Sequence, residues 1–205
     1  MKTNLSYLFL ALFAFLFIAA APDAGYKPGD KARDFKLKNI DGKMVSLADY
    51  KNVKGFIVAF TCNHCPFAKA YEERIIALNN KYAAKGYPVI AINPNDPNRE
   101  PDDSFDNMVI RAKDKKYPFP YLLDESQEIA KAYGATRTPH IYILSKKENE
   151  LTVEYIGAID DNADDASAVR TKYTENALDQ LLSGKKVEPN FTKVVGCTIK
   201  WKPAN

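Results

Sequence analysis

Two cysteines, spaced two residues apart, mark the point where a buried strand is followed by a helix. Residues 55–60 form a continuous apolar run, which is typical of a strand covered on both faces. The sequence Thr-Cys-Asn-His-Cys follows, and an amphipathic segment begins at Pro66. A cysteine at a helix N-terminus faces unpaired N–H groups and the positive end of the helix dipole, and both favour the thiolate. Cys62 and Cys65 in this setting therefore predict a redox-active pair, with Cys62 exposed and readily alkylated below pH 7.

Other uses of this pair fit the residues less well. A c-type haem site needs histidine directly after the second cysteine, where this chain has Pro66. A zinc site could use Cys62, His64 and Cys65, but no second ligand pair follows at finger-like spacing. A structural disulfide without a catalytic role is the remaining alternative. We therefore expect no metal, flavin or nucleotide cofactor.

The first residues resemble a secretory signal peptide. Lys2 is the only charged residue before Asp23, and residues 7–21 are an apolar run that ends in three alanines. A short basic region, an apolar region and small residues at the end predict a cleaved signal peptide over residues 1–21. The protein is thus expected to be exported, either periplasmic or secreted, with no stable membrane insertion after cleavage. An uncleaved N-terminal anchor is the alternative, although the run is short for a membrane span of about 20 residues.

The rest of the chain is long enough for one domain with a full core. We predict a domain over residues 22–186 and a tail over 187–205, which carries Phe191, Ile199 and Trp201 and should pack on the domain. The formal charge of +3 is small, and no basic patch with interleaved aromatics is present. Binding to nucleic acid is therefore not expected.

The first half of this domain reads as a hairpin followed by a parallel strand-helix-strand unit. Alternating apolar residues over 34–47, broken by Asp41-Gly42, predict the hairpin. The segment 66–85 carries one apolar stripe and predicts a helix, and 88–92 predicts the next buried strand. Three prolines over 93–101 predict a loop at the carboxyl edge of the sheet.

The second half predicts three helices and three strands. They are a helix with an apolar face over 105–112, a strand over 119–123, a capped helix over 124–133, an antiparallel pair over 140–144 and 151–159, and a last helix over about 165–182. The acidic segment 160–165 lacks the glycine and the closing glutamate of a calcium loop, so it predicts a helix start.

This order of motifs resembles the redoxin group of thioredoxin-fold proteins (alkyl hydroperoxide reductase/thiol-specific antioxidant-like), and its exported thiol-disulfide oxidoreductases in particular. The resemblance covers residues 26–184 and is carried by the Cys-x-x-Cys, by the blocks 119–124 and 132–135, and by Thr138-Pro139. It implies an α/β, thioredoxin-like three-layer fold, with a central mixed β-sheet, helices on both faces and an N-terminal β-hairpin extension.

The resemblance also implies roles for four residues. Cys62 would be the attacking cysteine, Cys65 the resolving one, and Pro139 a cis-proline against the dithiol. His64 stands just before the second cysteine, as in oxidising members such as protein disulfide isomerase. A partly protonated His64 near Cys62 would stabilise the thiolate. The alternative for His64 is a solvent-exposed residue at the helix start, and His140 is expected to be a packed or rim residue.

Two features depart from the family's patterns. Peroxidatic members carry Pro and Thr at the positions that Gly55 and Ala59 occupy here, which weakens a peroxidase interpretation. Thioredoxin carries an acid where this chain has Phe56, so the sequence names no general base. Cys197, between apolar neighbours, is expected to be a packed, inert thiol, and a third redox thiol is the alternative.

The predicted function is an exported thiol-disulfide oxidoreductase that uses Cys62 and Cys65. Its expected partners are protein or small-molecule disulfides and thiols, together with a redox donor or acceptor protein. A thiol-dependent peroxidase is the first alternative. The second is a non-enzymatic binding module whose disulfide is only structural.

Overall fold

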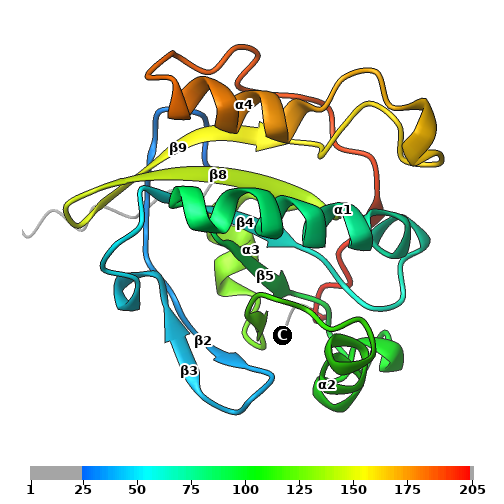
Figure 1. The fold of residues 1–205 in the computed structure, drawn as a ribbon. Coiled ribbons are helices and arrows are strands. Elements are labelled where there is room, and N and C mark those ends of the chain that lie inside the picture. The colour runs from blue at the N-terminus through cyan, green and yellow to red at the C-terminus, as the bar shows by residue number, and fades with distance from the viewer. Residues whose placement is uncertain (1–24, 204–205) are drawn as a thin grey trace, which may run out of the picture.

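The computed structural model describes residues 25–203, which form a mixed β-sheet with helices against it (Figure 1). The sheet strands are β1 (Lys31–Ala32), β2 (Lys36–Asn39), β3 (Met44–Ser46), β4 (Gly55–Phe60), β5 (Val89–Asn93), β6 (Tyr121–Leu123), β8 (His140–Lys147) and β9 (Glu150–Gly157). A separate short pair consists of β7 (Arg137–Thr138) and β10 (Cys197–Thr198). The helices are α1 (Pro66–Tyr82), α2 (Phe105–Asp114), α3 (Glu128–Tyr133) and α4 (Tyr173–Leu182).

The predicted signal peptide at residues 1–21 lies outside the described residues. Within residues 25–203, no helix is both long enough and apolar enough to cross a membrane.

The eight strands follow the order β1-β9-β8-β4-β5-β6-β2-β3. β5 runs parallel to both β4 and β6, whereas β8 is antiparallel to β4, so the sheet is mixed as expected. All residues of β4 and β5 are buried, which explains their continuous apolar sequences. The predicted hairpin forms from β2 and β3, and the predicted antiparallel pair forms from β8 and β9.

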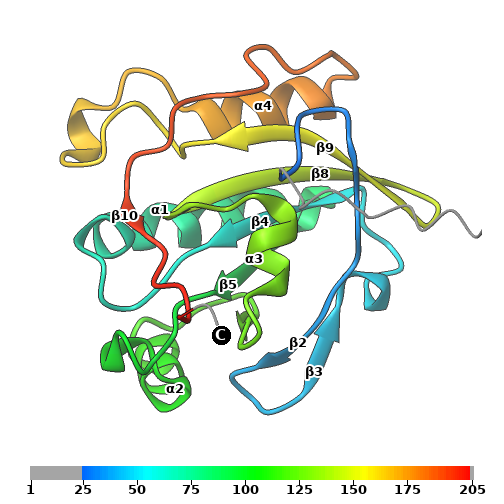
Figure 2. The same cartoon turned by 180° about the vertical axis from the view of Figure 1, so that it is seen from behind.

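Helices cover both faces of the sheet (Figures 1 and 2). α1 and α4 lie on one face, where their apolar side chains share a core with the inward side chains of β4 and β8. α3 packs on the opposite face, in a second core that also includes Phe35, Leu47 and Ile199. The three-layer arrangement predicted from the sequence is therefore confirmed.

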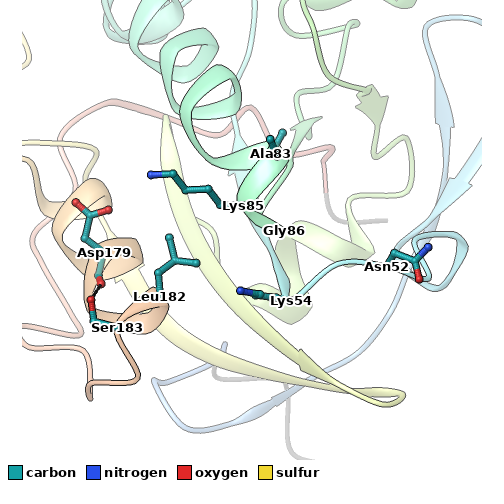
Figure 3. Close-up of a pocket in the computed structure, with 9 residues that line it drawn as sticks. Asn52, Lys54, Ala83, Lys85, Gly86, Asp179, Leu182 and Ser183 are labelled. Atoms are coloured by element: carbon teal, nitrogen blue, oxygen red, sulfur yellow. Dashed lines mark hydrogen bonds between the residues drawn. The ribbon is translucent and has the colours of Figure 1, made fainter.

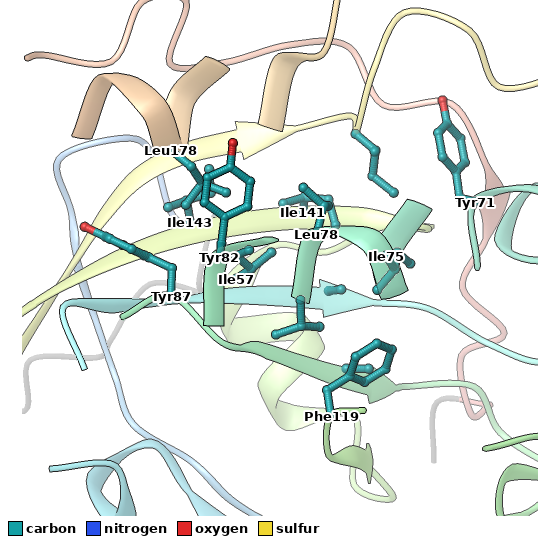
Figure 4. Close-up of a cluster of buried hydrophobic side chains, with 14 of the residues drawn as sticks. Ile57, Tyr71, Ile75, Leu78, Tyr82, Tyr87, Phe119, Ile141, Ile143 and Leu178 are labelled. Atoms are coloured by element: carbon teal, nitrogen blue, oxygen red, sulfur yellow. The ribbon is translucent and has the colours of Figure 1, made fainter. Parts of the chain in front are cut away.

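The apolar stripe of α1 is the main contact between this helix and the sheet. Tyr71, Ile75, Leu78 and Tyr82 are buried at spacings of four and three residues (Figure 4). Pro66 occupies the first helical turn, where its missing N–H costs nothing. After a 3-10 turn the chain leaves through Gly86 with a φ of 96°, the left-handed conformation that glycine tolerates best.

A buried ion pair attaches α2 to α1. Glu72 on α1 is almost fully buried and accepts hydrogen bonds from the Nε and Nη2 atoms of Arg111 on α2, at 2.7 and 3.1 Å. The buried residues of α2 are Met108 and Ala112. The 3-10 turn Pro101–Asp103 directly precedes α2.

Two predicted helix starts are wrong. The last helix begins at Tyr173, not near residue 165, because Asp165 caps only a short 3-10 turn at Ala166–Ala168. The following backbone is held in a loop, in which Arg170 N–H donates to the Asp161 carboxylate. α3 begins at Glu128 after a residue in the left-handed conformation, and the Asp124 carboxylate caps it by accepting the N–H of Ala130.

The chain after α4 returns across the molecule to the start of α1. β10 pairs antiparallel with β7 and lies beside the N-terminal end of α1 (Figure 2). Beyond it, the side chain of Gln127 donates to the carbonyl of Lys200 at 2.9 Å and accepts the N–H of Lys202 at 2.7 Å. These contacts hold the final residues against the loops that follow β5 and β6.

Shortening the stripe of α1 should destabilise the fold. We expect Leu78→Ala to lower the free energy of unfolding by about 2–5 kcal/mol, because it removes a buried side chain and leaves a cavity between α1 and the sheet. Urea denaturation followed by circular dichroism measures the change. The matched control is Glu73→Ala on the exposed face of α1, which should change stability by about 0.5 kcal/mol or less. Equal losses for both variants would contradict the packing described.

Candidate active site

The site is assembled at the carboxyl end of β4 from segments that are distant in the sequence. Cys62 lies in the turn after β4, and Cys65 is the residue that precedes the first turn of α1. The β7 strand faces them. Its Thr138 hydroxyl lies 3.1 Å from the Cys62 sulfur, and the peptide bond from Thr138 to Pro139 is cis, as expected.

The structure contains a disulfide between Cys65 and Cys197, and Cys62 is a free thiol. The expectation that Cys197 is an inert, packed thiol is therefore wrong. The disulfide forms because the tail pairs as a strand with β7. This pairing aligns Cys197 opposite Thr138 and brings it beside Cys65, with the Cα atoms of the two cysteines 6.0 Å apart. Exchange between Cys62 and Cys65 stays a prediction.

The expected exposure of Cys62 is also wrong for this state. Only 4% of Cys62 is accessible to solvent, because it lies against the Thr138 hydroxyl of β7 and belongs to a buried cluster against which Cys197 packs. Burial, which is the largest cause, and the nearby Asp103 carboxylate together raise the pKa of the Cys62 thiol to about 11. The Thr138 hydroxyl and the N–H groups of Cys65 and His64 oppose this rise. Favourable backbone donors are thus present, as predicted, but burial outweighs them.

Asp103 organises the turn between the two cysteines. This carboxylate is fully buried, and its Oδ1 atom accepts the N–H groups of Asn63 at 2.6 Å and His64 at 3.2 Å. Its Oδ2 atom accepts a hydrogen bond from the Asn95 side chain at 2.7 Å and contacts His64 Nδ1 at 2.5 Å. The turn Asn63–His64 is therefore fixed by the loop that follows β5.

Sequence reasoning missed Asp103. A usable signal was present, because the loop over 93–101 was expected at the carboxyl edge of the sheet, where β4 also ends. Nothing in the sequence distinguishes Asp103 from its neighbour Asp102, which is exposed.

His64 lies between the Cys62 sulfur and two carboxylates. Its Nδ1 atom is 3.6 Å from the sulfur and 2.5 Å from Asp103, and its Nε2 atom is 3.7 Å from Glu100. Only 14% of the His64 side chain is exposed, so the alternative of a solvated residue is wrong. The predicted proximity of His64 to Cys62 is confirmed, and its role stays a prediction.

Cys62, His64 and Asp103 also form a group with metal-ligand chemistry, since their ligand atoms lie within 4.8 Å of one another. Both oxygens of Asp103, however, already accept hydrogen bonds. The close contact from Asp103 to His64 would have to break before both side chains could bind one ion. We therefore interpret the group as a hydrogen-bonded network.

His140 is packed, as expected. It begins β8 directly after Pro139 and its ring lies on that of Tyr142, with centroids 4.8 Å apart. Neither ring nitrogen has a hydrogen-bond partner among the described residues, and burial lowers the pKa of His140 to about 4.

A hollow of about 610 Å³ lies away from the cysteines. It is lined by Lys54, by the end of α1 around Ala83–Gly86 and by Asp179 of α4 (Figure 3). This is the opposite end of α1 from Cys65. None of the cysteines lines this hollow.

Comparison with known proteins identifies the family of the chain. Residues 28–156, well over half of the chain, match the model of the AhpC/TSA family. The chain belongs to this family. An uncharacterized conserved protein from Geobacillus kaustophilus is 41% identical in its crystal structure, with a TM-score of 0.80 over 87% of this chain and 94% of that one.

Two further relatives bear on fold and chemistry. The thiol-disulfide oxidoreductase ResA of Bacillus thuringiensis subsp. konkukian is 29% identical over 118 residues. That match covers 58% of this chain and 64% of ResA, which is less than two thirds of its length. A thiol:disulfide interchange protein of the thioredoxin family from Chlorobium tepidum has a TM-score of 0.56 at 19% identity, over 78% of this chain and 99% of that one. This likeness confirms the predicted thioredoxin-like fold.

Removal of the buried charge should make the thiol more acidic. We expect Asp103→Asn to lower the Cys62 pKa below about 11, because a nearby negative charge opposes thiolate formation. The pKa should stay above the ordinary value of about 8.5, since burial is the larger cause and is unchanged. The pH dependence of iodoacetamide labelling of Cys62, with the Cys65–Cys197 disulfide intact, measures it.

The matched control for this experiment is Asp102→Asn. Asp102 is the exposed neighbour, and only its backbone carbonyl contacts the turn, through the Asn63 side chain at 2.9 Å. Its substitution should leave the Cys62 pKa unchanged. If Asp103→Asn raises the pKa, or acts no differently from the control, the electrostatic role of Asp103 is wrong.

Proposed function

We propose that the chain is an exported thiol-disulfide oxidoreductase in which Cys62 attacks and Cys65 resolves. The observation that carries this proposal is the meeting of a free Cys62 thiol, the half-cystine Cys65 and the Thr138-Pro139 loop at one strand end. Similarity to ResA, a thiol-disulfide oxidoreductase, supports the same reaction class. Family membership supports a redox enzyme over a binding module.

The reaction is two successive thiol-disulfide exchanges. The Cys62 thiolate attacks one sulfur of a substrate disulfide, so that a mixed disulfide forms and the other substrate sulfur leaves as a thiolate. The Cys65 thiolate then attacks the Cys62 sulfur. This releases the second substrate thiolate and leaves a Cys62–Cys65 disulfide. Run in reverse, the same steps oxidise a substrate dithiol. Both directions need a partner protein or thiol that restores the starting state.

The first exchange requires Cys62 to lose its proton. His64 Nδ1 lies 3.6 Å from the sulfur and 2.5 Å from the Asp103 carboxylate, so this nitrogen carries a hydrogen that it can donate to either group. We assign to His64 the stabilisation of the Cys62 thiolate, by donation of this hydrogen to the sulfur after the thiol proton has left to solvent. Cys62 loses its proton when a substrate, or a movement of the tail, uncovers the site.

Export is the part of the proposal that depends on the sequence alone. The basic and apolar character of residues 1–21 supports a signal peptide. Its expected consequence is a site that functions outside the reducing cytosol, where disulfide substrates are abundant. The partners are then exported proteins or small molecules that carry disulfides or thiols, and a redox protein that exchanges electrons with Cys62.

A competition assay distinguishes this function from a thiol peroxidase. We expect the fully reduced protein to reduce an insulin disulfide faster than it reduces hydrogen peroxide, because Gly55 and Ala59 occupy the positions of the peroxidase Pro and Thr. Both second-order rates are measured in parallel. Cys62→Ser should abolish disulfide reduction, and Cys65→Ser should accumulate a mixed disulfide that mass spectrometry detects.

Each alternative function has its own result in that assay. Peroxide reduction faster by orders of magnitude would identify a peroxidase. A folded protein with no exchange activity would identify a binding module whose disulfide is only structural. Asp102→Asn serves as the control for surface substitutions near the site, and should retain both rates.

A further inference from the structure

The three cysteines form one cluster around a shared sulfur. Cys62, Cys65 and Ala68 are buried together, and Cys197 packs against them. The Cys65 sulfur is disulfide-bonded to Cys197 and lies 3.4 Å from the carbonyl of Thr138, whose hydroxyl contacts the Cys62 sulfur. Cys65 is thus adjacent to two other cysteines, and it can form a disulfide with only one of them at a time.

The strand that carries Cys197 is fitted closely to the loop before Pro139. At Gly196 an added Cβ would lie 2.3 Å from the carbonyl oxygen of Thr138, so a residue with a side chain could not approach as closely. The Gly196 carbonyl accepts a hydrogen bond from the Arg137 guanidinium at 2.8 Å. Glycine at this position therefore lets β10 lie against β7 with Cys197 beside Cys65.

Polar side chains fix the residues that follow Cys197. Asn95 accepts the N–H of Lys200 at 2.9 Å, and the Lys200 carbonyl accepts the N–H of Asp96 at 2.9 Å. Gln127 is buried and binds the same carbonyl. Asn95 also donates to Asp103, so one side chain links the tail to the carboxylate beside Cys62. The tail is thus positioned by the same loop that builds the active site.

We propose that Cys197 is a third redox-active residue, and that the Cys65–Cys197 disulfide is an oxidised state that exchanges with a Cys62–Cys65 disulfide. This inference deepens the proposed function, on which it rests. The tail then acts as an internal thiol partner. It competes with external substrates for Cys65.

The exchange is balanced without an added oxidant. The Cys62 thiolate attacks the Cys65 sulfur, a Cys62–Cys65 bond forms, and the Cys65–Cys197 bond breaks. The electron pair of the broken bond goes to Cys197, which leaves as a thiolate. The proton lost by Cys62 ends on Cys197. One disulfide and one thiol are present before and after the step, so no net oxidation occurs.

The exchange changes what a partner can reach. In the Cys65–Cys197 state, β10 occupies the edge of β7, and a partner chain that adds a strand at this edge would be excluded. After exchange, only hydrogen bonds and packing retain the tail. A partner dithiol can then displace β10 and attack the Cys62–Cys65 disulfide. The tail therefore separates a covered oxidised state from a reactive one.

Disulfide mapping of oxidised cysteine variants tests the proposal. The full chain and its Cys62→Ser and Cys197→Ser variants are oxidised with glutathione disulfide, quenched in acid, alkylated, digested and analysed by mass spectrometry. We expect a Cys65–Cys197 peptide from Cys62→Ser and a Cys62–Cys65 peptide from Cys197→Ser. The unsubstituted chain should yield both, with its one free thiol divided between Cys62 and Cys197.

A substitution that shifts the tail should change the ratio of the two disulfides. In Gly196→Ala the added methyl group would meet the Thr138 carbonyl, so we expect the ratio of Cys62–Cys65 to Cys65–Cys197 disulfide to rise at least tenfold. Native alkylation of the free thiol should move from Cys62 to Cys197. Val195→Ala is the control, because this neighbouring side chain is 44% exposed and its loss should leave the ratio unchanged. Thermal unfolding verifies that all variants fold.

The results separate this inference from the proposed function. If Cys65 and Cys197 both remain free thiols in oxidised, folded Cys62→Ser, the inference is wrong, whatever the activity of the chain. The same holds if Gly196→Ala and its control give equal ratios. If the mapped disulfides appear as expected while the unsubstituted protein and Cys197→Ser reduce no insulin disulfide, the proposed function fails instead.

Discussion

The buried Asp103 carboxylate is the interaction on which the site depends. A carboxylate without solvent is costly unless hydrogen bonds replace its water, and here N–H donors from Asn63, His64 and Asn95 do so. Those donors belong to the cysteine turn and to the loop after β5, so the carboxylate holds the two segments together. The same charge raises the pKa of the Cys62 thiol, which stays protonated while it is covered.

Much of the fold could be predicted from local patterns. The buried run of β4, the stripe of α1 and the Asp41-Gly42 hairpin each identify their element within a few residues. A predicted helix start was wrong where side chains bind the backbone N–H groups of a loop instead of capping a helix. The acidic residues around Asp165 looked like a helix cap, but they satisfy loop N–H groups, and α4 begins only at Tyr173.

The site could be predicted only in part, because its remaining components come from distant segments. The Cys-x-x-Cys and Thr138-Pro139 have recognisable local sequences. Asp103 and Cys197 do not, since their importance arises from the loop after β5 and from the pairing of β10 with β7. Cys62 is buried in a cluster against which Cys197 packs, and no local pattern in the sequence predicts this burial or the raised pKa of the thiol.

The position of the disulfide in the chain has a consequence for stability. Cys65 and Cys197 are 132 residues apart, so their bond closes a loop that contains most of the domain. In the chain-entropy model, cross-links of such large loops disfavour the unfolded state by about 5 kcal/mol, whereas a loop as short as Cys62–Cys65 gives far less. Two oxidised isomers with the same number of bonds would thus differ widely in resistance to unfolding and proteolysis. The lifetime of the protein would then depend on which of its cysteines are paired.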